Sequence, residues 1–330
     1  MDDSNHVELP DDFSILIFSI VVIGDEILRG QTQDTNTYFL SKKLHHLGVK
    51  VQRVSIIPDD LATISQEVLE FSKRYTFVLT SGGVGPTHDD ITYEGVAAAF
   101  GEKVVPHSDL IEKLKFYFKT DDMTSPAMKM GHVPESAVLE YGEDRVSGVK
   151  ARWPVISVKN VTIFPGVPHL LEKSFSLLGE KLFARPGVGF HGRTIYLTTD
   201  EVSMTPILNE TVSKFPEVSF GSYPKLFHSY YKTKITMESL NSKFVEEAEH
   251  YFKEKTKDGW IIDYISDTVS SPWPHIQKLL ASSSSLKPAL TEALDIINQC
   301  FDKYTPYSTR FNWPKVAECI PHLSKDTMQR

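Results

Sequence analysis

A glycine-rich segment directly after an apolar strand pattern constrains this chain most. Residues 81–90 read Ser-Gly-Gly-Val-Gly-Pro-Thr-His-Asp-Asp, between an apolar run at residues 77–80 and a helical pattern at residues 93–100. Such a strand, loop and helix start let a ligand's phosphates reach backbone N–H groups and the positive end of the helix dipole. Alternatively, the glycines only satisfy a tight turn. The neighbouring loops must decide between these readings.

The first hundred residues alternate strand and helix patterns. Strands are expected within residues 13–23, 49–57 and 77–80, and helices over residues 36–47, from about residue 60, and over residues 93–100. This order predicts parallel strands with right-handed crossovers and helices on both faces of the sheet.

In such a sheet, ligands bind at the carboxyl ends of the strands, where acidic residues follow each predicted strand. Asp59 and Asp60 are interpreted as helix caps. For Asp25 and Glu26 a functional role is favoured, because they directly follow a buried strand and precede Arg29, a candidate phosphate ligand. The loops therefore favour a metal-assisted nucleotide site. His88 is expected to face solvent.

The second half of the chain follows a different pattern. A helix at residues 110–118 and an alternating strand at residues 155–164 lead to a turn at residues 165–168. The order β-α-β-β-α-β is then expected, which predicts a ferredoxin-like α+β unit. Its elements are placed at residues 194–198, 206–215, 218–223, 230–237, 243–255 and 260–265.

The predicted organisation is a flexible tail at residues 1–12, a nucleotide-binding α/β domain at 13–184, the small α+β domain at 185–268, and a linker with a partly ordered helical tail at 269–330. A helix is expected at residues 290–304. Residues 221–224 either face the first domain's site or turn the chain.

Charge and missing motifs exclude several functions. The net charge of −8 argues against sequence-independent binding of nucleic acid or an anionic membrane. Two cysteines, Cys300 and Cys319, indicate neither a disulfide framework nor a cysteine zinc site, which fits a cytoplasmic protein.

The glycine loop lacks a P-loop ending, and no dinucleotide fingerprint or hydrolase elbow occurs. The remaining chemistry is a metal and carboxylates acting on a phosphoanhydride.

Taken together, the motifs resemble a known family, the molybdopterin-binding (MoaB/Mog-like) domain of the type found in bacterial CinA and in the N-terminal half of eukaryotic FAD synthase. The resemblance covers about residues 15–304 and implies a three-layer, mostly parallel sheet. It is carried by residues 24–30, 34–37, 81–92, 165–168 and 221–224.

The chain departs from FAD synthase at its C-terminal end. That enzyme continues into a PAPS-reductase-like domain, whose Gly-Gly-Lys-Asp-Cys loop carries the adenylyltransferase reaction. Here the sequence diverges from Thr305 onward and the loop is not found before Arg330. We therefore expect a shortened isoform or truncated gene product that does not make FAD by that route.

The resemblance implies a pyrophosphatase that hydrolyses FAD, or an ADP-ribose-like dinucleotide, to mononucleotides. It implies a divalent metal (Mg²⁺, Co²⁺ or Mn²⁺), with K⁺ as a further candidate. A homo-oligomer or full-length FAD synthase is a candidate partner. Two alternatives stay open: a non-catalytic module that senses flavin nucleotide, and a molybdopterin-binding or adenylylating protein. The implied site residues are Asp89, Asp90 and Glu26 for catalysis, Asp25 and Asp89 for metal, and Gly82, Gly83, Gly85, Thr87, Arg29 and Asn36 for phosphate or nucleotide.

Overall fold

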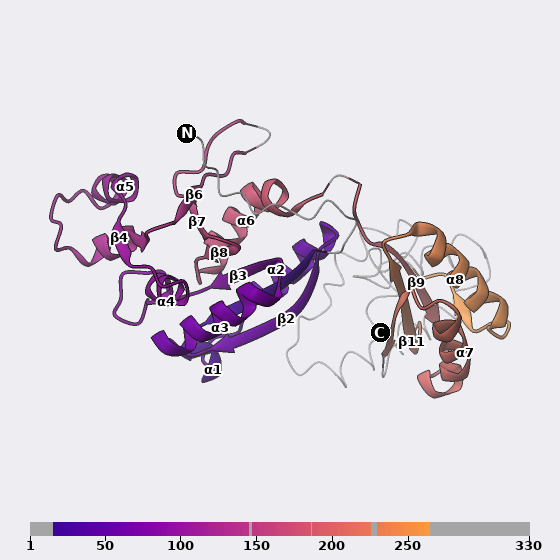
Figure 1. Ribbon diagram of the computed structural model, residues 1–330. Coiled ribbons are helices and arrows are strands. Elements are labelled where there is room, and N and C mark those ends of the chain that lie inside the picture. The colour runs from indigo at the N-terminus through magenta and orange to yellow at the C-terminus, as the bar shows by residue number, and fades with distance from the viewer. Residues whose placement is uncertain (1–15, 145–146, 186, 226–229, 265–330) are drawn as a thin grey trace, which may run out of the picture. The chain divides into compact units, whose positions relative to one another are not determined.

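The computed structural model describes residues 16–144, 147–185, 187–225 and 230–264. Its larger sheet has six strands in the order β2-β1-β3-β8-β7-β6 (Figure 1). The first four of these are mutually parallel, β7 pairs antiparallel with β8, and β6 pairs antiparallel with β7. The expected α/β fold with a mostly parallel sheet is thus confirmed. The strands are β1 (Ile17–Ile23), β2 (Lys50–Ile57), β3 (Phe77–Ser81), β6 (Val138–Glu140), β7 (Val155–Val158) and β8 (Val161–Phe164).

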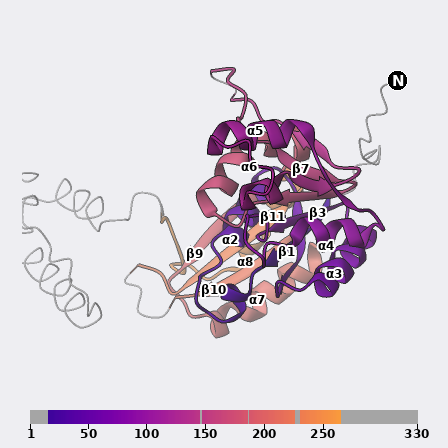
Figure 2. The ribbon, with the colours of Figure 1, turned by 90° about the vertical axis from the view of Figure 1, so that its left-hand side faces the viewer.

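Helices cover both faces of this sheet, because apolar side chains alternate between the two faces of β1. Phe18, Ile20 and Val22 pack with the buried residues of α2 (Asn36–His46) and α6 (Pro168–Phe183). On the other face, Val21 and Ile23 pack with α3 (Leu61–Arg74) and α4 (Thr92–Ala99). In Figure 2 these two helix pairs lie on opposite sides of β1. The result is a three-layer domain.

The strand order reverses direction between β1 and β3, since the chain passes from β1 outward to β2 and then returns to pair β3 on the other side of β1. In open α/β sheets, such a switch point leaves a crevice outside the carboxyl ends of the two strands. The loop after β1 and the glycine loop after β3 flank this point.

The single strand expected at residues 155–164 is wrong. The structure has two antiparallel strands here, β7 and β8, which pair Val158 with Val161. Lys159 adopts a left-handed φ of 51°, which allows a two-residue turn. The Asn160 side chain then donates to the carbonyls of Ser72 and Tyr75. The apolar alternation is the same for one long strand and for a hairpin, and this turn decides between them.

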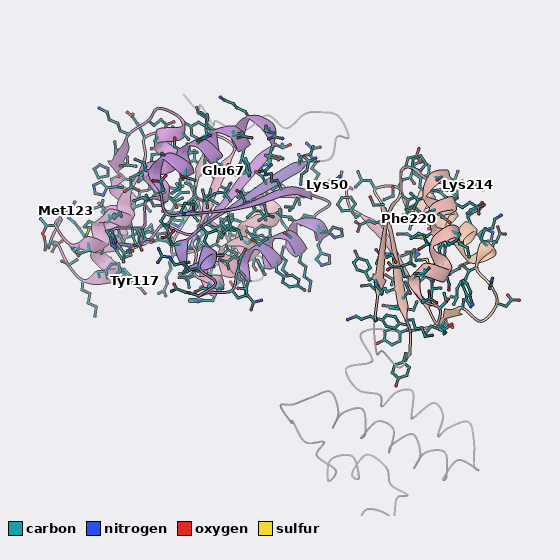
Figure 3. The ribbon with its side chains drawn as sticks, turned by 90° about the horizontal axis from the view of Figure 1, so that it is seen from below. Lys50, Glu67, Tyr117, Met123, Lys214 and Phe220 are labelled. Carbon is teal, nitrogen blue, oxygen red and sulfur yellow. The ribbon has the colours of Figure 1, made fainter. Side chains whose placement is uncertain are left out.

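A segment between α4 and β6 forms a small lobe. Strands β4 (Val104–Pro106) and β5 (His132–Pro134) pair antiparallel around α5 (Ser108–Phe118) and the 3₁₀ helix η1 (Pro126–Gly131). Met128 of η1 is buried against Ile111 and Leu114 of α5. Figure 3 labels Tyr117 and Met123, which lie at the surface of this lobe.

Residues 191–262 form a separate four-stranded antiparallel sheet with the order β10-β11-β9-β12. Helices α7 and α8 pack on it around a buried core that includes Ile235, Met237 and Phe252. Sequence order and strand order together match the expected ferredoxin-like unit. Its elements are β9 (His191–Leu197), α7 (Glu201–Lys214), β10 (Ser219–Pro224), β11 (Thr233–Ser239), α8 (Ser242–Lys255) and β12 (Ile261–Ile262).

One expectation within this unit is wrong, and one of two open readings is excluded. Helix α7 begins at Glu201 rather than at Pro206, because Asp200 caps it by accepting from the Ser203 N–H, and Pro206 lies inside the helix. For residues 221–224 a turn is excluded, because they belong to the edge strand β10, which was expected at residues 218–223 and in which Gly221 pairs with Thr236 of β11.

The predicted tail at residues 1–12, the linker and the helix at 290–304 lie outside the described residues. Among the helices that are described, none is both long and apolar enough to cross a membrane.

Candidate active site

The loop after β1 is a single turn of helix, α1 (Asp25–Leu28), which places Asp25 and Glu26 in its first turn. The Asp25 N–H donates to Asp59 Oδ2 across 2.9 Å, which joins this turn to the loop after β2. The Asp25 carboxylate pairs with Arg29 one turn later, at 2.5 Å from Nη2. The expected metal ligand and the expected phosphate ligand therefore neutralise each other here.

The glycine loop after β3 is held tightly by backbone constraints. Gly82 has a φ of +111°, and a Cβ at this position would lie 2.0 Å from the carbonyl oxygen of Ile23. Gly83 has a φ of +63°, and its Cβ would lie 2.3 Å from Thr92 Oγ1. Both positions therefore require glycine for steric reasons alone. The turn reading is correct for these two residues, whatever the loop binds.

The same loop also presents backbone donors. Within the described residues, the amides of Gly83, Val84 and Gly85 donate no hydrogen bond, although all three residues are only partly exposed. The flanking positions are fixed: the Gly82 N–H donates to Phe164 O, and the Thr92 N–H donates to Gly83 O. Successive amides around left-handed glycines form a concave anion site of the kind that cradles phosphate. The loop is thus both a steric turn and a set of free donors.

Residues 87–90 order themselves through side chains. The Thr87 N–H donates to Asp90 Oδ2 at 2.9 Å, and the Thr87 hydroxyl faces carboxylate oxygens of both Asp89 and Asp90. One hydroxyl hydrogen can serve only one acceptor at a time. The hydrogen bond from Thr87 is the main reason why the pKa of Asp89 lies below its ordinary value. His88 is 97% exposed, as expected.

Asn36, at the start of α2, connects two loops. Its Nδ2 donates to Ser81 Oγ at 2.9 Å and to the Gly166 carbonyl at 2.7 Å. A Cβ on Gly166 would lie 3.1 Å from the Gly82 Cα, so the loop after β8 touches the glycine loop backbone to backbone. The side chain is 8% exposed, and its amide hydrogens are both used. Asn36 is therefore placed as a brace behind the glycine loop.

The acidic side chains of three loops lie within electrostatic range of one another. Burial is the largest cause that raises the pKa of Asp59, and repulsion from Glu26, Asp25 and Asp89 raises it further. The hydrogen bond from the Asp25 amide opposes these effects. The strand-end loops thus converge at the switch point, as the topology requires.

Among the described residues, no group of three or more His, Cys, Asp or Glu side chains is arranged to hold a metal ion by itself. The donor set nevertheless suits Mg²⁺, which binds to one or two carboxylates and completes its shell with water and substrate phosphates. Carboxylates that repel each other and free amides beside them match that mode of binding.

Sequence reasoning missed two residues at this site. Asp59 follows the second strand on the same sheet edge. Because it precedes a helix, the sequence favoured a capping role for it, but only Asp60 caps that helix. Lys129 of η1 donates to the Thr87 carbonyl at 2.5 Å. No local signal could have found it, because it is separated from the glycine loop by 42 residues.

The chain is similar to two families in sequence. Residues 19–185 match the family described as "Probable molybdopterin binding domain", and residues 189–265 match "FAD synthase, middle domain". A "Probable FAD synthase" of Caenorhabditis elegans is 33% identical over 332 residues, which cover 92% of this chain and 63% of that protein. A protein of Archaeoglobus fulgidus whose name states no function is 36% identical over 209 residues, which cover 63% of this chain and 86% of that protein.

Among solved structures, the crystal structure of "the protein CinA with unknown function" from Thermoplasma acidophilum is 30% identical, with a TM-score of 0.45, and covers 51% of this chain and 98% of that one.

Proposed function

From the fact that this chain belongs to the family with a probable molybdopterin binding domain, here followed by an FAD synthase middle domain, we propose that it hydrolyses the diphosphate of a dinucleotide. FAD, cleaved to FMN and AMP, is the leading substrate, and ADP-ribose is a related one. The similarity to proteins named as probable FAD synthases supports a flavin nucleotide. The chain spans about 63% of the length of those relatives, so their full activity is not assigned to it.

One observation carries the proposal: free backbone amides at residues 83–85 lie on the same sheet edge as the carboxylates of Asp25, Glu26, Asp59 and Asp89. The amides would bind phosphate oxygens without side chains that could block access. A divalent ion such as Mg²⁺, held by Asp25, Asp89 and the ligand's own phosphate oxygens, would neutralise charge on the diphosphate.

In the proposed reaction, a water oxygen attacks one phosphorus atom of the diphosphate. The bond from that phosphorus to the bridging oxygen breaks, and the bridging oxygen leaves with the other mononucleotide. Glu26 is the best placed base for the water's proton, because its exposed carboxylate accepts no hydrogen bond from the described residues. Asp90, which accepts from Thr87, instead keeps the loop in shape.

Arg29 and Asp25 have to separate for this site to form. In the structure they are paired and largely exposed, at 64% and 40% of their side-chain surface. An exposed pair contributes little to stability, typically about 0–1 kcal/mol, so it can exchange for stronger partners. We expect Arg29 to turn to a phosphate when Asp25 binds the metal.

The test uses the purified full-length chain with FAD or ADP-ribose and Mg²⁺, Mn²⁺ or Co²⁺ in turn, with products separated by chromatography. We expect equimolar FMN and AMP from FAD, and a loss of about 100-fold or more in kcat/KM for Asp89→Asn. Asp121→Asn, which removes the same charge from the exposed loop after α5, is the matched control and should keep full activity. No turnover with any metal would refute the hydrolytic function.

A second function, binding of a flavin nucleotide without hydrolysis, is favoured by one observation. No described group of three acidic or histidine side chains forms a metal site, and Asp25 is already neutralised by Arg29. Saturable FAD binding with no products would support this reading. A molybdopterin-dependent reaction that consumes ATP would instead support a molybdopterin-adenylylating role, of which the family's description names only the binding of molybdopterin.

A further inference from the structure

Lys129 is a cation that the fold brings to the glycine loop from a distant segment. It lies in η1, and its Nζ donates to the carbonyl oxygen of Thr87 at 2.5 Å. The residues on either side fix its backbone: Met128 is 1% exposed and packs with α5, and the Gly131 carbonyl accepts from the His107 N–H at 2.9 Å. The backbone position from which this ammonium group projects is therefore set by packing and not by a flexible loop.

The ammonium of Lys129 has unused hydrogen-bonding capacity. A lysine carries three N–H donors, of which the Thr87 carbonyl takes one. Among the described residues, no carboxylate lies within ion-pair distance of Lys129, and the residue is partly buried. Its electrostatic neighbour is Asp89, whose pKa it helps to lower, so the two free N–H donors of Lys129 lie beside the glycine loop without a close hydrogen-bond acceptor.

The loop thus offers two different anion-binding features close together. The free amides belong to residues 83–85, and Lys129 is attached at residue 87. Two residues of backbone span no more than about 7 Å, so one ligand with two linked phosphoryl groups can reach both features.

We propose that Lys129 binds the second phosphoryl group of the ligand and so makes the site selective for diphosphates over monophosphates. The amides at residues 83–85 hold one phosphoryl group, and the two remaining N–H donors of Lys129 hold the other. This inference rests on the proposed function, in that it takes the glycine loop as the phosphate site, but it does not require hydrolysis.

The first test measures binding by calorimetry, with inorganic pyrophosphate or orthophosphate titrated into the full-length chain at constant Mg²⁺. Lys129→Met keeps the length of the side chain and removes its charge. We expect it to weaken pyrophosphate binding about tenfold or more and to change orthophosphate binding less than threefold. Lys129→Arg should retain most of the pyrophosphate affinity. Lys73→Met, on the exposed end of α3 at the opposite edge of the sheet, is the matched control.

The outcomes separate this inference from the hydrolytic function. Equal pyrophosphate affinity in Lys129→Met and Lys73→Met would overturn the role of Lys129 even if FAD is hydrolysed. Loss of affinity only in Lys129→Met would support that role even if FAD is not hydrolysed. A wild-type chain that binds no pyrophosphate would overturn the role of Lys129, and the FAD assay would still decide the hydrolytic function by itself.

A second test needs no variant and so does not depend on how a substitution folds. The wild-type chain is acetylated briefly with acetic anhydride, with and without pyrophosphate, and modification at each lysine is followed by mass spectrometry. We expect pyrophosphate to slow modification of Lys129 at least fivefold while Lys73 reacts at an unchanged rate. Equal rates at Lys129 in both conditions would contradict the inference.

Discussion

At the scale of single residues, the site depends on positions where the backbone tolerates no side chain. Gly82 lies with its Cα against the Ile23 carbonyl on one side and the Gly166 loop on the other. The strand ends can approach each other closely only because these glycines lack a Cβ. Under the proposed function, stability and ligand binding depend on the same atoms, and substitutions here should affect both.

Gly82→Ala is predicted to destabilise the fold more than an alanine at another left-handed glycine. Gly101 has a φ of +70° with no atom within 4 Å of an added Cβ, so Gly101→Ala should cost only conformational strain, about 1 kcal/mol. Gly82→Ala adds a clash with the Ile23 carbonyl and should cost roughly 2–5 kcal/mol. Urea unfolding of both variants measures the free energies. Equal losses would show that the close approach at Gly82 is relaxed in solution.

At the scale of elements, the start of helix α3 shows how two adjacent acidic residues take different roles. Of the two adjacent acids before this helix, Asp60 caps it by accepting from the Thr63 N–H at 2.9 Å, whereas Asp59 accepts from Asp25 at the site. The cap leaves Asp59 free to serve the strand-end cluster. A stable start of α3 is therefore a condition for the geometry of that cluster.

The cap predicts a specific dependence on pH. The hydrogen bonds from the Thr63 side chain and amide lower the pKa of Asp60 below its ordinary value of 3.8. A lowered folded-state pKa means that the stabilisation is complete above about pH 3.8 and is lost as the pH falls through the folded-state pKa. Thermal melts should show a lower Tm for Asp60→Ala at pH 7, with the difference from wild type shrinking below pH 3.8.

The control for this prediction is Asp60→Asn, whose neutral amide oxygen can still cap the helix. It should stay close to wild type in Tm at pH 7. Its difference in Tm from Asp60→Ala should not change with pH, because the amide does not titrate. A difference between wild type and Asp60→Ala that persists unchanged at pH 3 would contradict the assigned role of the carboxylate.

Local sequence patterns predicted much of the fold and less of the site. The alternation of apolar strands with helices such as 36–47 needs only neighbouring residues, and α2 was found almost to the residue. The hairpin at Lys159 was missed because a two-residue turn leaves the apolar alternation unbroken. Lys129 and the brace at Asn36 depend on contacts across 42 and 130 residues, which no local pattern encodes. The pairing of Arg29 with Asp25 was missed because both roles were assigned separately.

At the scale of the whole molecule, the described chain has separate hydrophobic cores. Two of them lie on opposite faces of the six-stranded sheet, and a third, formed by residues such as Ile235, Met237 and Phe252, lies under the four-stranded sheet. A residue in the third core supports only its own sheet and helices. Each sheet should therefore respond to core substitutions largely by itself.

Phe252→Ala tests this independence. Phe252 is fully buried, so its truncation should destabilise the four-stranded unit by roughly 3–5 kcal/mol. Hydrogen exchange followed by mass spectrometry should show faster exchange in β9 and β11 and unchanged protection in β1 and β3. Phe71→Ala, in the core beneath α3, should give the reverse pattern. Loss of protection in both sheets in either variant would mean that they unfold as one cooperative unit.

The free amides at residues 83–85 have a consequence for how this protein can diverge. Every amino acid except proline supplies the same N–H, so substitutions can hardly tune a contact that the main chain makes. A change of ligand is therefore expected to require changes in residues that other segments bring to the glycine loop, above all in the lobe that carries Lys129. Under the role proposed for Lys129, exchanging that lobe for another should change ligand preference while the backbone amides of residues 83–85 stay the same.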